Sequence, residues 1–162
     1  CAVKHNARRA FLGQVGVASV SLLWLGLAST GVVSLPVSVL EAAGVQSNGN
    51  ERRYPIPASD GVTVDKSAQL ILVRYASHVY VFALSCPHQN NAVKWNAKAA
   101  RFQCTKHDSE YQPDGLHVSG RATRNLDRYV IHRDGDSVVV DLRRWIQSDK
   151  DSAGWTAATI AV

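Results

Sequence analysis

The sequence has few cysteines and no methionine: three cysteines occur among its 162 residues. Cys86 and Cys104 belong to a motif described below, and Cys1 is the only other thiol, so a disulfide framework is excluded. With so few thiols, cysteine usage does not report the redox compartment. Because methionine is absent, we expect that the chain has been processed or that its first residues are missing.

The chain also lacks a strong excess of charge of one sign. Its formal net charge is +5, and Lys4, Arg8 and Arg9 supply three of these charges, which leaves +2 for everything that follows. This balance is too weak and too mixed for a nucleic-acid-binding protein. The length is typical of one compact domain with an N-terminal addition.

Residues 10–40 contain no charged side chain. As a helix this segment would be about 46 Å long, enough to cross the roughly 30 Å hydrocarbon core of a bilayer. Pro36 marks its end or a kink. We predict a retained transmembrane helix over 10–40. A cleavable signal peptide is the alternative, although its apolar core is normally shorter.

The charges that flank this segment predict its orientation. The basic residues of segment 1–9 place the N-terminus in the cytoplasm and the rest of the chain on the outer side of a bacterial cytoplasmic membrane. Arg8, Arg9, Phe11 and Leu12 also resemble part of a twin-arginine export signal, which would let a folded, cofactor-loaded domain cross. Ordinary flanking charge is the alternative interpretation.

The rest of the chain divides into three parts. Residues 41–54 are rich in Gly, Ser and Asn and predict a flexible hinge spanning roughly 20 Å. Residues 55–148 predict a mainly β head, and 149–162 a C-terminal tail that could dock on the head or on a partner.

Two β-hairpins are predicted within the head. Strand-like runs at 70–75 and 79–84 flank the turn residues Ala76-Ser77-His78. Runs at 128–133 and 137–141 flank Asp134-Gly135-Asp136.

The most specific motif pairs Cys86-x-His88 with Cys104-x-x-His107. Each half follows a strand-like segment, so the four side chains should lie in two loops at one end of the β fold. Two thiolates and two imidazoles can hold a [2Fe–2S] cluster in which histidines replace the cysteines on one iron. The same set also suits a tetrahedral zinc ion.

With these motifs the chain resembles the Rieske iron–sulfur family over roughly residues 62–141. The resemblance implies a small antiparallel β-sandwich head with a cluster-binding subdomain and one N-terminal transmembrane helix. It implies that Cys86 and Cys104 hold the inner iron and that His88 and His107 hold the outer one. The last residues that it assigns to the site are Ser109, which would bond a bridging sulfide, and Tyr111, which would bond a cysteine sulfur.

Two departures from the family pattern stand out. Asn91 and Lys106 occupy the positions where members from cytochrome bc- and bf-type complexes carry a second pair of cysteines, joined as a disulfide. The stretch Gly120–Leu126 resembles instead the Rieske small subunits of arsenite-oxidase-type molybdopterin oxidases.

Three functional hypotheses follow. The first is a one-electron carrier of a membrane quinol-oxidising complex, working with b-type and c-type cytochromes and not catalytic alone, in which His107 faces the quinol. The second is the electron-relay subunit of an exported molybdopterin oxidase. The third is a zinc-stabilised binding module on the cell surface.

The remaining histidines and the basic residues near the motif are interpreted as solvated side chains. For Arg121, Arg124 and Arg128, a docking patch for an acidic cytochrome is the alternative. The histidines not expected to bind metal are His5, His78, His117 and His132.

Overall fold

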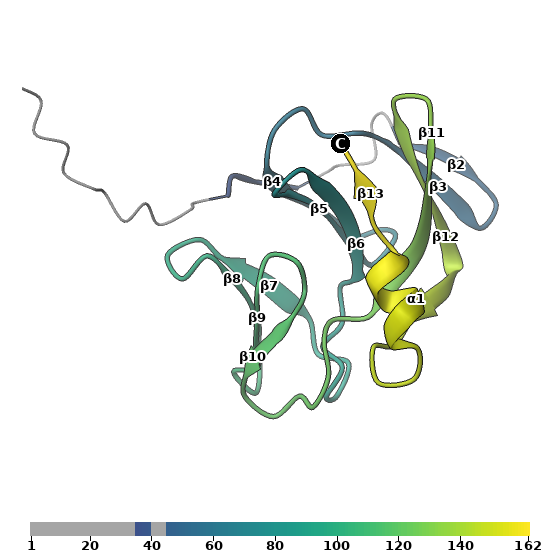
Figure 1. The fold of residues 1–162 in the computed structure, drawn as a ribbon. Coiled ribbons are helices and arrows are strands. Elements are labelled where there is room, and N and C mark those ends of the chain that lie inside the picture. Colours follow the sequence, from purple (N-terminus) through teal and green to yellow (C-terminus); the bar gives the residue numbers. More distant parts are fainter. Residues whose placement is uncertain (1–34, 40–44) are drawn as a thin grey trace, which may run out of the picture. The chain divides into compact units, whose positions relative to one another are not determined.

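The computed structural model describes residues 35–39 and 45–162 (Figure 1). These residues form β-strands and one short helix, so the mainly β prediction is confirmed. Within them, no helix has the length and apolar character needed to cross a membrane. The elements are β1 (Val37–Val39), β2 (Gln46–Asn48), β3 (Glu51–Pro55), β4 (Gly61–Asp65), β5 (Leu70–Tyr75), β6 (His78–Ala83), β7 (Val93–Asn96), β8 (Arg101–Cys104), β9 (Glu110–Tyr111), β10 (His117–Ser119), β11 (Arg128–Asp134), β12 (Ser137–Ile146), α1 (Ser152–Ala157) and β13 (Ile160–Ala161).

Both predicted hairpins are confirmed. β5 pairs with β6, and β11 pairs with β12, each in antiparallel register. The first turn is tight, with positive φ angles at Ala76 (50°) and Ser77 (62°). The second contains Gly135 at φ +58°. Positive φ at the centre of a two-residue connection matches the right-handed twist of the flanking strands.

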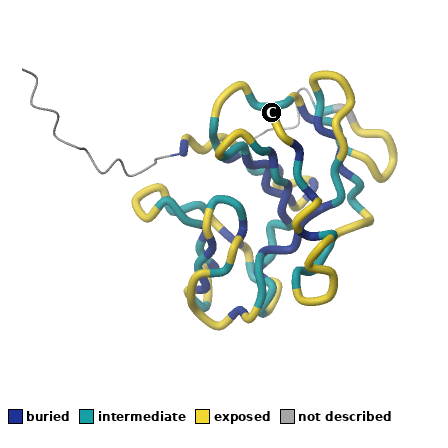
Figure 2. The backbone as a smooth tube through the Cα atoms, in the orientation of Figure 1, coloured by how far each residue is buried: buried dark blue, intermediate teal, exposed yellow. Residues whose placement is uncertain are grey.

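Nine of the described strands form one large sheet that folds over on itself. Its order is β1-β4-β5-β6-β11-β12-β3-β2, with β13 also paired to β6. Only one residue pair, Phe82 with Arg128, joins β6 to β11. The two halves therefore face each other across a core of buried side chains, which include Leu70, Val81 and Val138. Figure 2 shows that burial is concentrated along these central strands.

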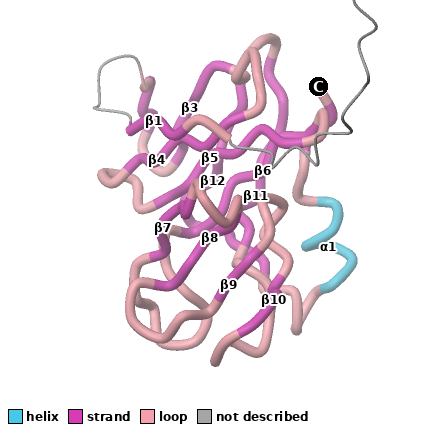
Figure 3. The backbone as a smooth tube through the Cα atoms, turned by 90° about the vertical axis from the view of Figure 1, so that its left-hand side faces the viewer, coloured by secondary structure: helices cyan, strands magenta, loops and turns pink. Residues whose placement is uncertain are grey.

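Strand β5 is buried on both faces. Successive side chains of a strand point to opposite sides. Leu70 and Leu72 pack into the large-sheet core, whereas Ile71 and Val73 pack into a second core. That second core also contains Phe102, from the four-stranded sheet β10-β9-β8-β7. Figures 1 and 3 show this small sheet at one end of the large one.

The hinge predicted over 41–54 differs from the structure wherever its residues are described. β2 pairs with β3, and β3 pairs with β12 over Glu51–Pro55. Tyr54 is fully buried and donates a 2.7 Å hydrogen bond from its hydroxyl to Asp65. The segment resembles a linker in sequence because most of its strand residues are polar and lie outside the core.

The end of the predicted membrane segment also belongs to the sheet. Leu35 is buried, and β1 pairs in parallel with β4. The rest of the 10–40 prediction, with segment 1–9 and its twin-arginine residues, lies outside the described residues.

The C-terminal tail, whose docking site was left open, packs on the head. β13 pairs with the first residues of β6, through Ile160 opposite Val79. It thereby covers an edge of β6 that β11 leaves unpaired.

The hydrogen bonds around the Asp65 carboxylate predict that the stability of the fold depends on pH. Burial acts to raise the pKa of its carboxyl, but hydrogen bonds from Ser67, Ala68 and Tyr54 outweigh it and hold the pKa below its usual value. The carboxylate therefore stabilises the fold above about pH 3.9, the ordinary value for Asp, and this contribution is lost as pH falls through the folded-state pKa.

We expect Asp65→Asn to lower the free energy of unfolding at pH 7 by about 1.5–3 kcal/mol, because charge-assisted hydrogen bonds are lost. The variant should also lose less stability between pH 5 and pH 2 than the wild type does. Urea titrations across that range measure both effects. Asp136→Asn, an exposed turn position, is the matched control; equal losses for the two variants would contradict the prediction.

Candidate metal centre

The two cysteine motifs lie in two loops of the small sheet. The first loop, Cys86–Asn91, joins β6 to β7, and the second, Cys104–Ser109, joins β8 to β9. Each loop closes on its own cysteine: Cys86 N–H donates to Asn91 O at 2.7 Å, and Cys104 N–H donates to Ser109 O at 2.8 Å. The predicted arrangement of two loops at one end of a β fold is therefore present.

The two cysteines form a buried pair of free thiols. Cys86 is 0% and Cys104 1% exposed. Burial acts to raise the pKa of Cys104, yet hydrogen bonds from the backbone N–H groups of Lys106 and His107, and from Cys86, lower it overall. Such donors stabilise the thiolate, which is the form that binds metals.

The two histidines form a second pair, closer to the surface. Their Nδ1 atoms lie 3.3 Å apart, and the rings of His88 and His107 meet edge to face with centroids 4.9 Å apart. Two nitrogens bound to one tetrahedral metal at about 2.1 Å would lie about 3.4 Å apart. Burial, His88 and the nearby cations Lys106 and Arg121 lower the pKa of His107, which favours the neutral ring that a metal requires.

The four side chains do not surround a single point. Within the part of the chain that the structure describes, no three His, Cys, Asp or Glu side chains gather as a site for one metal ion. A buried thiol pair and a partly exposed imidazole pair fit a two-iron cluster with unlike ligands on its two irons.

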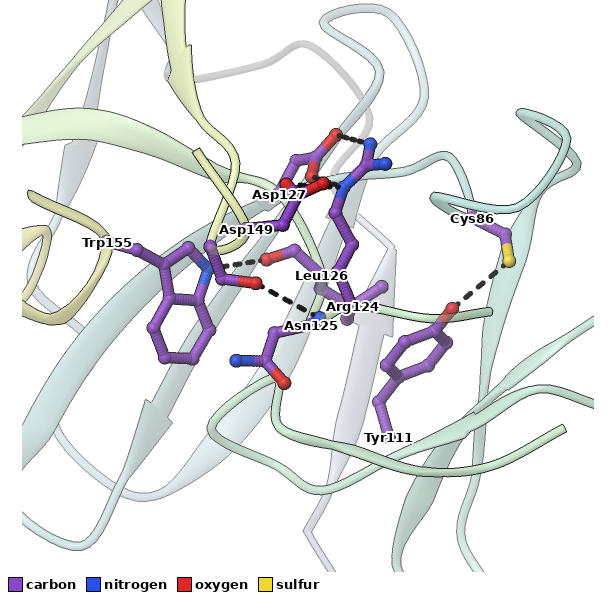
Figure 4. A network of polar contacts seen from close by, with 9 residues as sticks. Cys86, Tyr111, Arg124, Asn125, Leu126, Asp127, Asp149 and Trp155 are labelled. Atoms are coloured by element: carbon purple, nitrogen blue, oxygen red, sulfur yellow. Dashed lines mark hydrogen bonds and ion pairs between the residues drawn. The ribbon is translucent and has the colours of Figure 1, made fainter. Parts of the chain in front are cut away.

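Two hydroxyl groups lie beside the thiol pair. Tyr111 is fully buried, and its Oη lies 3.2 Å from the Sγ of Cys86 (Figure 4). Burial, followed by the bond to Cys86, raises the pKa of Tyr111, so the phenol stays protonated and can donate to sulfur. Ser109 is also fully buried; its Oγ accepts the N–H of Ala122 at 3.0 Å, and its side chain also hydrogen-bonds to Tyr111, which acts to lower the pKa of that phenol.

Comparison with known proteins identifies the family. Residues 49–130 match the family model of the Rieske [2Fe-2S] domain, which is half of the chain. The chain belongs to the Rieske family. Its cofactor is accordingly a Rieske [2Fe–2S] cluster, and the protein transfers electrons.

Curated relatives match only in part. The chain is 36% identical over 64 residues to the chloroplastic cytochrome b6-f complex iron-sulfur subunit of Bigelowiella natans, covering 40% of this chain and 25% of that protein. It is 34% identical over 74 residues to the cytochrome b6-f complex iron-sulfur subunit of a Synechococcus species, covering 44% and 40% respectively. The chain thus spans between a quarter and two fifths of these relatives' length.

Solved structures give more distant matches. The plasma membrane Rieske protein PetC3 of Synechocystis has a TM-score of 0.40 and 19% identity, over 56% of this chain and 85% of that one. The ferredoxin of carbazole 1,9a-dioxygenase from Nocardioides aromaticivorans has a TM-score of 0.38 and 16% identity, over 54% and 91%.

In this Rieske protein, hydrogen bonds occupy the place of a disulfide between the loops. Asn91 and Lys106 occupy the two positions where members from cytochrome bc- and bf-type complexes carry the additional cysteines. Thr105, which the sequence did not single out, donates both its backbone N–H and its Oγ1 hydroxyl to Ala92 O, each at 3.0 Å. The second loop is thereby fastened directly beside the end of the first.

A third segment of the Rieske domain lies against the second loop. Gly120 has φ +91°, and a Cβ placed there would lie 2.7 Å from Ser109 N and 2.8 Å from Asp108 O. Only glycine fits this contact without a backbone shift. The close approach brings Ala122 within reach of the Ser109 hydroxyl.

The basic residues do not form the solvated face that was predicted. Arg128 is 4% exposed, stacks 3.6 Å from the Trp155 ring centroid, and has a pKa lowered to about 10, chiefly by burial. Arg124 pairs with Asp127 at 3.0 Å, and Arg121 alone of the three is exposed. The sequence alone suggested that Arg128 lies on the surface. Its burial could not be foreseen because the groups that contact its guanidinium are backbone carbonyl oxygens and aromatic rings.

The histidines outside the motif differ in their surroundings. His132 is exposed, and His78 is half-buried and lies 3.0 Å from the carbonyl oxygen of Ala76 through its Nδ1. His117 is half-buried, with its ring 5.6 Å from that of Tyr111. His5 lies outside the described residues.

Gly120→Ala tests the contact between the third segment and the second loop. We expect it to lower the free energy of unfolding by about 1–3 kcal/mol more than Gly135→Ala does, because the backbone must also shift. Gly135 is the matched control, since its φ is +58° and a Cβ there meets nothing within 4 Å. Chemical denaturation measures the difference, and equal costs would overturn the prediction.

Proposed function

We propose that this Rieske protein is the one-electron carrier of a membrane quinol-oxidising complex. Cys86 and Cys104 would hold the inner iron, and His88 and His107 the outer iron. The bound cluster supplies one-electron redox chemistry in the high-potential range that histidine ligation allows. The observation that carries the proposal is the burial of the thiol pair together with two hydroxyl groups, while the histidine pair reaches the surface.

The hydroxyl groups support a high potential. Tyr111 bonds the Sγ of Cys86, and Ser109 hydrogen-bonds to Tyr111. By the resemblance to high-potential Rieske proteins, the Ser109 hydroxyl would donate to a bridging sulfide when the cluster is bound. Hydrogen bonds to sulfur stabilise the additional electron of the reduced state, and they are a recognised determinant of potential. Quinol oxidation requires an acceptor at the upper end of the range.

The histidine pair supports quinol as the donor. His107 is half-exposed, and its Nδ1 faces His88, so Nε2 is the ring nitrogen left to exchange a proton with a quinol hydroxyl. An imidazole at the surface can thus take a proton where an electron enters. The buried thiols have no such access.

The partners are proposed from the relatives and from charge. Both curated relatives are subunits of cytochrome b6-f complexes, so we propose b-type and c-type cytochromes as partners. The charge-free residues before Leu35, preceded by Arg8 and Arg9, would form the single-pass anchor, with the head outside a bacterial cytoplasmic membrane.

A second candidate is the electron-relay subunit of an exported molybdopterin oxidase. Its specific support is the pair of loops without a second cysteine, tied through Thr105, and the Gly120–Leu126 stretch. In that role the donor would be a molybdenum centre on a larger subunit and quinol would not react.

Reduction by quinol decides between the two functions. We expect stopped-flow mixing of the membrane-extracted protein with a short-chain quinol to reduce the wild type, and His107→Ala to abolish this reduction. His132→Ala, on an exposed strand position, should react normally. Iron is assayed in every sample, and full-rate reduction of an iron-loaded His107→Ala protein would contradict the proposal.

A further inference from the structure

The segment between β10 and β11 approaches the cluster site without being part of a sheet. Residues 120–127 carry no strand pairing. Ala122 N–H nevertheless donates to Ser109 Oγ at 3.0 Å, and Gly120 packs closely against the backbone of Ser109. The position of this segment, and with it the orientation of the Ser109 hydroxyl, therefore depends on individual contacts. Two of them are backbone bonds, from Leu126 N–H to Gly115 O and from Ala83 N–H to Asp127 O, each at 3.0 Å.

Three further contacts come from the C-terminal segment. Ser148 Oγ accepts the N–H of Asn125 at 3.2 Å, and Asp149 lies 3.6 Å from Arg124. The shortest bond of this set runs from Trp155 Nε1 to the carbonyl oxygen of Leu126, at 2.7 Å (Figure 4).

Trp155 is itself firmly placed. It lies in α1, is 6% exposed, and its carbonyl oxygen accepts Nη1 of Arg128 at 2.8 Å. The Arg128 guanidinium also stacks on its indole ring. A six-residue helix is not stable alone, so these contacts and the pairing of β13 fix it on the head.

Leu126 links the position of Trp155 to the cluster site. It is fully buried in the same core as Cys86, Cys104 and Tyr111, and Ala122 lies in that core too. A shift of Leu126 would therefore move the residues that orient Ser109.

We infer that Trp155 is a positioning residue for the cluster. It holds Leu126, and through the 120–127 segment it orients the Ser109 hydroxyl toward its acceptor. The C-terminal segment would thereby set the reduction potential from outside the residues that match the family model, which end at 130. The inference rests on the proposed role of Ser109 as a donor to the cluster.

A double-mutant cycle on the iron-loaded protein tests it. Trp155→Phe keeps an aromatic ring beneath Arg128 but removes the Nε1 donor. We expect it to lower the midpoint potential by part of the drop that Ser109→Ala causes. The double variant should have the potential of Ser109→Ala alone. Hydrogen exchange at the Ala122 amide should also be faster in Trp155→Phe.

Trp145→Phe is the matched control, since Trp145 is 54% exposed, and it should leave the potential unchanged. If Ser109→Ala lowers the potential and Trp155→Phe changes only the melting temperature, the positioning role is overturned while the proposed function stands. The positioning role is also overturned if Trp155→Phe shifts the midpoint potential equally in the wild type and in the Ser109→Ala variant. If Ser109→Ala leaves the potential unchanged, the proposed donor role of Ser109 fails, and the inference fails with it.

Discussion

The burial of both faces of β5 is the constraint on which the rest of the structure depends. Leu70 and Leu72 face the core of the large sheet, while Ile71 and Val73 face the core that contains the two cysteines. Side-chain alternation in one strand thus links two cores. Because protein cores are close-packed, the small sheet and its loops are held at a defined position on the large sheet.

That constraint produces a site with a buried part and a part near the surface. The thiols and hydroxyls are shielded from water, where hydrogen bonds to sulfur act in a low dielectric. The histidines lie nearer the surface, where they can meet a redox partner. Between the loops, Thr105 makes two hydrogen bonds to Ala92 in place of a covalent link. Thiol reductants therefore have no disulfide to break between these loops, because Asn91 and Lys106 stand where other members carry the second cysteines.

The sequence was informative where the chemistry is local. The spacing of Cys86, His88, Cys104 and His107 predicted two loops, and the hairpins around Ser77 and Gly135 followed from short β-branched runs and turn residues. What it did not reveal depends on contacts between distant segments. β2 and β3 are polar strands recognised only by their pairing, β2 with β3 and β3 with β12.

Buried polar contacts were likewise hidden. Arg128 has carbonyl and aromatic partners, and Trp155 acts on Leu126 across 29 positions. No local pattern encodes such pairs.

The most direct test of the two-pair site is the Mössbauer spectrum of iron-57-enriched protein after reduction. Two irons per chain are predicted, in two unlike environments, with the ferrous character on the histidine-ligated iron. One metal per chain, or two equivalent irons, would contradict the assignment of Cys86 and Cys104 to one iron and of His88 and His107 to the other.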